Sequence, residues 1–234
     1  MLVSAASLKQ QCPHLPITLF TDQVDFVHPL IDQVLPIENP TYSFLDRFQA
    51  FSQSPYQKSL YLDSDTLILQ PLDELFTLLE RAQLAAAHAP LRVSPKKRYQ
   101  REDIPSSFSQ FNCGVLGYQA SPEMVALFAD WKKRFIAHHS QDERSCDQPA
   151  FREALWSSNI TYHVLPSEYN YRLPYYALKG MWSKVVIAHS HIFSQMSPQE
   201  RATFKEALDD NRALFWDPFK ENLIANGQTS QKWR

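Results

Sequence analysis

Two aspartates, Asp63 and Asp65, interrupt an apolar stretch and constrain the fold more than any other feature of this chain. Residues 60–62 before them predict a buried strand, and residues 67–69 form a second apolar run. Because alternate side chains of a strand point to the same side, both carboxylates can reach one point. Like charges that close repel unless a cation lies between them. A hard divalent ion, Mg²⁺ or Mn²⁺, shared with substrate phosphates is therefore expected, with a solvated turn as the alternative.

The rest of the chain alternates between strand-like and helix-like patterns, which predicts an α/β fold whose largely parallel sheet is flanked by helices. Strands are expected at residues 16–20, 34–37, 59–63, 84–89, 111–119, 160–165 and 185–188. Helices are expected at residues 1–11, 42–52, 72–79, 124–138, 147–156 and 197–214. A chain of 234 residues, 44% of them hydrophobic, can bury one sizeable core. We expect one domain at 1–196 and a C-terminal helix with a polar tail at 197–234.

Composition excludes several classes of function. A net charge of −2 gives no reason to expect binding to nucleic acid or to an anionic membrane. The four glycines form neither of the Gly-rich phosphate-binding loops. A bound diphosphate would therefore depend on a metal ion and basic side chains. Three cysteines without a C-x-x-C pair, no signal peptide and no long apolar span indicate a cytoplasmic protein with reduced thiols and no transmembrane segment.

Four polar clusters lie at the expected strand ends or helix starts, where an α/β fold can gather them in one crevice. They are Asp63 with Asp65, residues 112–114, Asp147 with Gln148, and His189 with His191. The basic segment 90–109 is either a functional lid or a solvated loop.

In order and spacing, five motifs across roughly residues 2–191 resemble the nucleotide-diphospho-sugar glycosyltransferases of GT-A fold, especially glycogenin-like and bacterial relatives of family 8. SPYQKSLYLDSDTLILQPLDELF is similar to the strand, DxD motif and helix of that family. FNCGVLGY, DQPAFREAL and LPSEYNYR resemble three further segments, and VVIAHSH resembles the strand that ends in a metal-binding histidine.

The resemblance implies transfer of a hexose from a nucleoside diphosphate sugar, a UDP-sugar, to a sugar, lipid or protein acceptor, with retention of configuration. It implies Mn²⁺ (or Mg²⁺) held by Asp63, Asp65 and His189, with His191 a weaker candidate ligand. An imidazole ligand favours Mn²⁺ over Mg²⁺.

The resemblance also gives catalytic roles to Arg47, Asp147 and Gln148. The charge of Arg47 would face the donor, and Asp147 and Gln148 would contact the transferred sugar. Arg47 as a solvated helix residue and Asp147 as a helix N-cap are the structural alternatives.

Three more residues are implied in substrate binding. Ser64 would contact the ribose, and Asn112 and Gly114 would line the sugar pocket. Asn112 could instead satisfy backbone groups at a strand edge.

One departure from the family concerns the first helix, which contains Met1 where relatives have a strand before it, so the first strand is apparently missing. A truncated, non-catalytic GT-A-like interaction module is therefore an alternative. An Asp-x-Asp phosphatase of the haloacid-dehalogenase type is a weaker one, because such enzymes carry the pair near the chain start and a Thr or Val where Leu67 stands.

Overall fold

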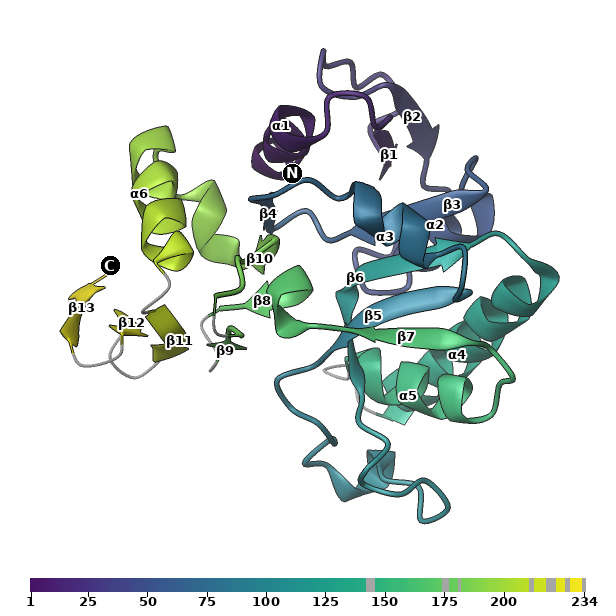
Figure 1. The fold of residues 1–234 in the computed structure, drawn as a ribbon. Coiled ribbons are helices and arrows are strands. Elements are labelled where there is room, and N and C mark those ends of the chain that lie inside the picture. Colours follow the sequence, from purple (N-terminus) through teal and green to yellow (C-terminus); the bar gives the residue numbers. More distant parts are fainter. Residues whose placement is uncertain are drawn as a thin grey trace. The chain divides into compact units, whose positions relative to one another are not determined.

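The computed structural model describes residues 1–141, 146–173, 177–180, 182–210, 213–217, 222–225 and 228–232. The chain forms two compact units, each built from separate stretches of sequence (Figure 1). Unit 1 comprises Met1–Leu15, Leu62–Glu74 and Leu165–Arg234, and unit 2 comprises Pro16–Tyr61 and Leu75–Val164.

Unit 2 contains a small parallel sheet and a larger four-stranded sheet. Its strands are β1 (Thr18–Thr21), β2 (Gln33–Pro36), β3 (Lys58–Leu62), β5 (Leu84–His88), β6 (Phe111–Gln119) and β7 (Tyr162–Leu165). Its helices are α2 (Arg47–Gln53), most of α3 (Asp73–Leu78), η1 (Lys97–Tyr99), α4 (Pro122–Gln141) and α5 (Gln148–Trp156). β1 and β2 pair with each other, and the larger sheet has the order β3-β6-β5-β7 with β5 and β6 antiparallel.

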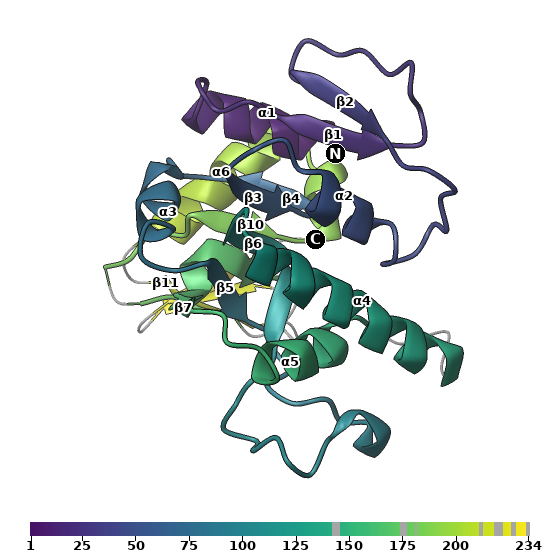
Figure 2. The same cartoon turned by 90° about the vertical axis from the view of Figure 1, so that its right-hand side faces the viewer.

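The core of unit 2 is rich in aromatic rings, and helix α4 supplies Phe128, Trp131 and Phe135 at helical spacing. α4 and α5 lie side by side (Figure 2). Trp131 of α4 is fully buried, with its ring centroid 4.5 Å from Phe151 and 4.8 Å from Phe48. This packing fixes the start of α5, where Asp147 and Gln148 lie.

The segment 90–109 is packed against the rest of unit 2 and is not a simple solvated loop. Arg152 of α5 donates hydrogen bonds to the carbonyl oxygens of Ile104, Pro105 and Phe108 at 3.3, 2.9 and 2.6 Å. Tyr99 is buried, with its ring 4.6 Å from the His138 ring.

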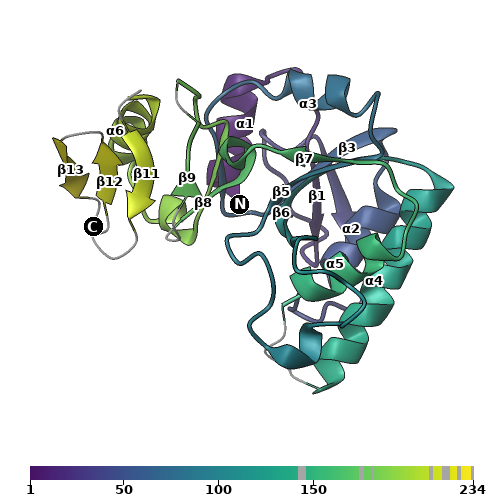
Figure 3. The same ribbon diagram turned by 60° about the horizontal axis from the view of Figure 1, so that its bottom comes forward.

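Unit 1 is built around a three-stranded sheet of order β4-β10-β8. Its elements are α1 (Leu2–Gln11), β4 (Thr66–Ile68), η2 (Ser167–Asn170), β8 (Tyr171–Arg172), β9 (Ala177–Leu178), β10 (Ile187–His189), η3 (His191–Ser194) and α6 (Pro198–Asp209). β10 is antiparallel to β4 and parallel to β8, and α1 is tied to β4 by a hydrogen bond from the Ile68 N–H to the Ser7 hydroxyl at 2.9 Å. The strands β11 (Ala213–Asp217), β12 (Asn222–Ala225) and β13 (Gln228–Lys232) form an antiparallel sheet with β9 (Figure 3).

The predicted α/β class with helix-flanked sheets is confirmed, and helix α6 begins with a capping box between Ser197 and Glu200. The expectation of a mostly parallel sheet is corrected, because β4–β10, β5–β6 and the C-terminal strands pair antiparallel. The last helix ends at Asp209 instead of residue 214, and the polar tail contains β12 and β13. The division into 1–196 and 197–234 stays a prediction.

Two local predictions also fail. Residues 60–62 are only half-buried, because β3 is an end strand in the order β3-β6-β5-β7. Helix α2 begins at Arg47 instead of residue 42, because the Asp46 carboxylate accepts the backbone N–H groups of Thr41 and Tyr42, both at 2.8 Å. Among the residues that the structure describes, no helix has both the length and the hydropathy needed to span a membrane.

Candidate functional site

The turn between β3 and β4 holds Asp63 and Asp65 in place. The Thr66 N–H and hydroxyl both donate to the Asp63 carbonyl oxygen, at 3.2 and 2.9 Å. The antiparallel register then sets His189, at the end of β10, opposite Thr66. The Ser190 N–H donates to the Asp65 carbonyl oxygen at 3.0 Å, which joins this turn to the end of β10.

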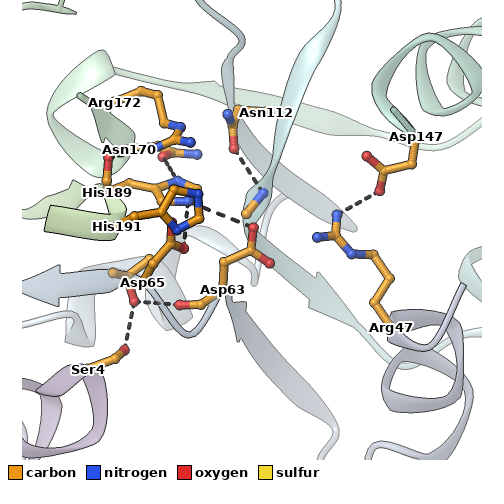
Figure 4. A network of polar contacts seen from close by, with 12 residues as sticks. Ser4, Arg47, Asp63, Asp65, Asn112, Asp147, Asn170, Arg172, His189 and His191 are labelled. Atoms are coloured by element: carbon orange, nitrogen blue, oxygen red, sulfur yellow. Dashed lines mark hydrogen bonds and ion pairs between the residues drawn. The ribbon is translucent and has the colours of Figure 1, made fainter. Parts of the chain in front are cut away.

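The three predicted metal ligands, Asp63, Asp65 and His189, come together at this point (Figure 4). Nε2 of His189 lies 3.0 Å from Oδ1 of Asp65 and 3.8 Å from Oδ2 of Asp63. One candidate ligand atom from each residue lies within 4.8 Å of the other two. His189 is buried and the two aspartates are partly exposed, so an ion at this position could also contact a ligand from solvent.

Asn170 orients the imidazole of His189, a role that the sequence reasoning missed. Its Oδ1 lies 2.8 Å from Nδ1 of His189, and both residues are buried. With the amide oxygen as acceptor, Nδ1 carries a proton, and Nε2 faces the two carboxylates. The signal was present in the LPSEYNYR segment, one of the five motifs that carry the family resemblance, which contains this asparagine.

Opposing effects act on the pKa of the Asp65 carboxyl group. Burial raises the pKa of the Asp65 carboxyl, but the hydrogen bond and charge of His189, with the charges of His191 and Arg172, lower it to about 2. His191 is 83% exposed, and its Nδ1 lies 3.1 Å from Oδ2 of Asp65. His191 is therefore a neighbour of Asp65 and is not part of the three-residue cluster.

In unit 2, Arg47 and Asp147 form a buried ion pair. Nη1 of Arg47 lies 2.6 Å from Oδ2 of Asp147, and the two side chains are only 8% and 3% exposed. The guanidinium also lies 4.9 Å from the ring centroid of Phe44 and 5.5 Å from that of Tyr61. The alternative of a solvated Arg47 is therefore wrong. Asp147 occupies the N-cap position of α5, but its side chain makes no capping hydrogen bond.

The remaining predicted residues have simpler environments. Ser64 is exposed in the turn between Asp63 and Asp65. Asn112 is buried on β6, and its Oδ1 accepts the N–H of Gly114 at 2.9 Å, so it does satisfy a backbone group. Gln148 is half-buried at the start of α5.

No protein-family model matches the sequence, and neither does any curated protein. Solved structures do resemble the fold. The chain is similar to the galactosyltransferase LgtC in complex with donor and acceptor sugar analogs, at 14% identity and a TM-score of 0.52 over 85% of this chain and 83% of LgtC. An active-site glutamine-to-glutamate mutant of LgtC gives 15% identity and a TM-score of 0.53, over 81% of each chain. Apo mouse xyloside xylosyltransferase 1 gives 15% identity and a TM-score of 0.51, over 83% of this chain and 92% of that one. The protein therefore has the GT-A fold of nucleotide-sugar glycosyltransferases.

Proposed function

We propose that this protein is a metal-dependent glycosyltransferase that transfers a hexose from a UDP-sugar to a sugar, lipid or protein acceptor, with retention of configuration. The observation that carries the proposal is the cluster of Asp63, Asp65 and His189, with ligand atoms within 4.8 Å of one another. It is supported by the similarity to a galactosyltransferase that was solved with donor and acceptor sugar analogs.

The donor atoms of the cluster fit a divalent ion. Two carboxylates and one imidazole, already oriented by Asn170, suit Mn²⁺ better than Mg²⁺. A bound ion would supply Lewis-acid stabilisation of the charge on a nucleoside diphosphate leaving group. Ser64, exposed between the two aspartates, would contact the ribose.

Further residues would act on the sugar. Asp147 and Gln148 would contact the transferred hexose, and Asn112 and Gly114 would line its pocket. The buried ion pair changes the expected role of Arg47. Because the guanidinium is bound to Asp147 at 2.6 Å, we assign Arg47 to positioning Asp147 as well as to adding positive charge.

A reducing compartment such as the cytoplasm would suit the thiols. Cys12, Cys113 and Cys146 form no disulfide bond.

The test is calorimetric titration of UDP and of UDP-glucose with and without Mn²⁺, on the wild type, on Asp65→Asn and on Asp103→Asn. Asp103 is a matched control because its carboxylate is exposed and pairs with Arg101. We expect Mn²⁺-dependent binding in the wild type and the control, and its loss in Asp65→Asn. Equal binding in Asp65→Asn would refute the donor site, as would absence of binding in every condition. Hydrolysis of p-nitrophenyl phosphate that depends on Asp65 would favour the phosphatase alternative.

A further inference from the structure

A second concave site in unit 1 lies at the opposite end of the β4–β10 ladder from the metal cluster. The ladder runs from the pair Thr66–His189, beside the cluster, to the pair Ile68–Ile187. One step further, the Leu69 N–H donates to the Val186 carbonyl oxygen at 2.8 Å. A pocket of about 510 Å³ begins there, lined by residues of the turn into α3, of η2 and of 183–186. At about 3.3 Å per residue, the ladder separates the two sites by roughly 10 Å.

The walls of this pocket are held in place before any ligand binds. The Tyr169 hydroxyl donates to the Glu74 carboxylate. The buried Glu168 carboxylate accepts the Gly180 N–H at 2.5 Å, and its carbonyl oxygen accepts the Val186 N–H at 2.9 Å. Polar groups that are already oriented reduce the entropy cost of binding, so this is a preorganised site.

The lining identifies the chemistry of the ligand. Its polar residues are Gln70, Asp73, Glu74, Glu168, Ser183 and Lys184. Three carboxylates against one ammonium disfavour an anion and favour a ligand with many hydrogen-bond donors. Pro71, Pro166 and the Tyr169 ring add apolar surface between these groups. Sugar rings combine donating hydroxyls with apolar C–H faces, and a pocket of this volume accommodates one or two of them.

A second, independent observation concerns Trp182, which is not itself a lining residue but is next to one in the sequence. Its indole is 72% exposed, and its backbone has a φ of 66°, which bulky residues rarely adopt. It directly precedes Ser183 of the lining. The Ser183 N–H donates a hydrogen bond to the Gly180 carbonyl oxygen at 3.0 Å. A large apolar ring held in water on a strained backbone is unfavourable unless it serves a contact.

We propose that this pocket is a second carbohydrate-binding site, for a neutral or amino-sugar oligosaccharide, with Trp182 as a stacking surface. The site shares no residue with the metal cluster, so it would bind sugar whether or not the metal cluster binds a nucleotide sugar. In a transferase it would hold a distal part of a glycan.

The test is titration of three trisaccharides that differ in charge: chitotriose, which is neutral, the chitosan trimer, which is cationic, and trigalacturonate, which is anionic. We expect the first two to bind the wild type and trigalacturonate to bind at least about tenfold more weakly. Trp182→Ala and Glu74→Gln should each weaken binding about tenfold. The amide of Glu74→Gln can still accept the Tyr169 hydroxyl, so this variant changes charge with little change in shape.

Two control variants separate this site from the rest of the molecule. Trp156→Ala removes another exposed tryptophan, 41% exposed, and should leave trisaccharide affinity unchanged. Asp65→Asn should also bind the trisaccharides normally while losing Mn²⁺-dependent UDP binding. The proposal is overturned if no trisaccharide binds at about 10 mM, if trigalacturonate binds most tightly, or if Trp182→Ala binds like the wild type.

Discussion

The metal cluster and the Arg47–Asp147 pair are both groups of poorly exposed charges, but their charges are satisfied in opposite ways. Arg47 and Asp147 carry opposite charges at 2.6 Å and satisfy each other. Asp63 and Asp65 carry the same charge and share one neighbouring imidazole, His189. The pair is therefore expected to govern stability, whereas the cluster is expected to govern the binding of a cation. Four experiments test this difference.

The largest effect is expected from Arg47→Ala. It leaves the buried Asp147 carboxylate without its cation, so unfolding free energy should fall by about 3–5 kcal/mol. Urea denaturation measures the change. Arg101→Ala is the control, because Arg101 and Asp103 are also 2.6 Å apart but are 38% and 56% exposed, and its loss should be about 0–1 kcal/mol. The double variant Arg47→Met, Asp147→Asn should recover much of the stability. Equal losses of unfolding free energy in Arg47→Ala and Arg101→Ala would contradict a buried ion pair between Arg47 and Asp147.

The second experiment is addition of Mn²⁺ to the metal-free protein. An ion that binds only the folded state should stabilise it by about 2.7 kcal/mol at a hundred times its dissociation constant. Differential scanning calorimetry should show a rise in Tm that a chelator reverses. Asp63→Asn should show little rise. If Mn²⁺ raised the Tm of Asp63→Asn as much as that of the wild type, the ion would be bound elsewhere.

A smaller effect is expected from Asn170→Ala. Without its acceptor, the His189 ring can rotate or change tautomer, and affinity for Mn²⁺ should fall about 10- to 100-fold. Asn170→Asp keeps an acceptor for the Nδ1 proton and should retain most of the affinity. Electron paramagnetic resonance of free Mn²⁺ measures both. Unchanged affinity in Asn170→Ala would remove Asn170 from the site.

The smallest effect concerns acid stability. The pKa of Asp65 is about 2 in the folded protein, against about 3.9 for an unfolded aspartate. Its contribution is therefore fully present above about pH 4 and is lost as the pH falls toward 2. When the pH is lowered from about 5 to about 2.5 in metal-free buffer, the Tm of the wild type should fall further than the Tm of Asp65→Asn. Parallel losses would show that the carboxylate is not held by its histidine neighbours.

Local sequence patterns were sufficient to place an element where its hydrophobic periodicity agrees with the observed burial. The aspartate pair, β6 and the start of α5 lie where the sequence placed them, because each is a polar break beside an apolar run. The two aspartates are brought to His189 by strand pairing, and the likeness to a known family pointed to that histidine in advance.

Features that depend on distant residues were missed. No local pattern shows that Arg47 would pair with Asp147, a hundred positions away, or that Asn170 would hold the His189 ring. The parallel sheet was expected from strand–helix alternation, which does not determine the direction of pairing between β4 and β10. The Asp46 carboxylate binds the N–H groups of Thr41 and Tyr42 in a turn where Tyr42 has a φ of 53°, so α2 starts later than helical periodicity suggests.

The discontinuity of unit 1 has a consequence for biosynthesis. Unit 2 is complete once residue 164 has been made, whereas unit 1 needs both its first and its last residues. At about 5–20 residues per second, several seconds separate the emergence of Asp63 and Asp65 from that of His189. During that interval the two carboxylates leave the ribosome with no imidazole partner. Any affinity of the cluster for a metal ion would therefore arise only after His189 has been made, when unit 2 has had time to fold.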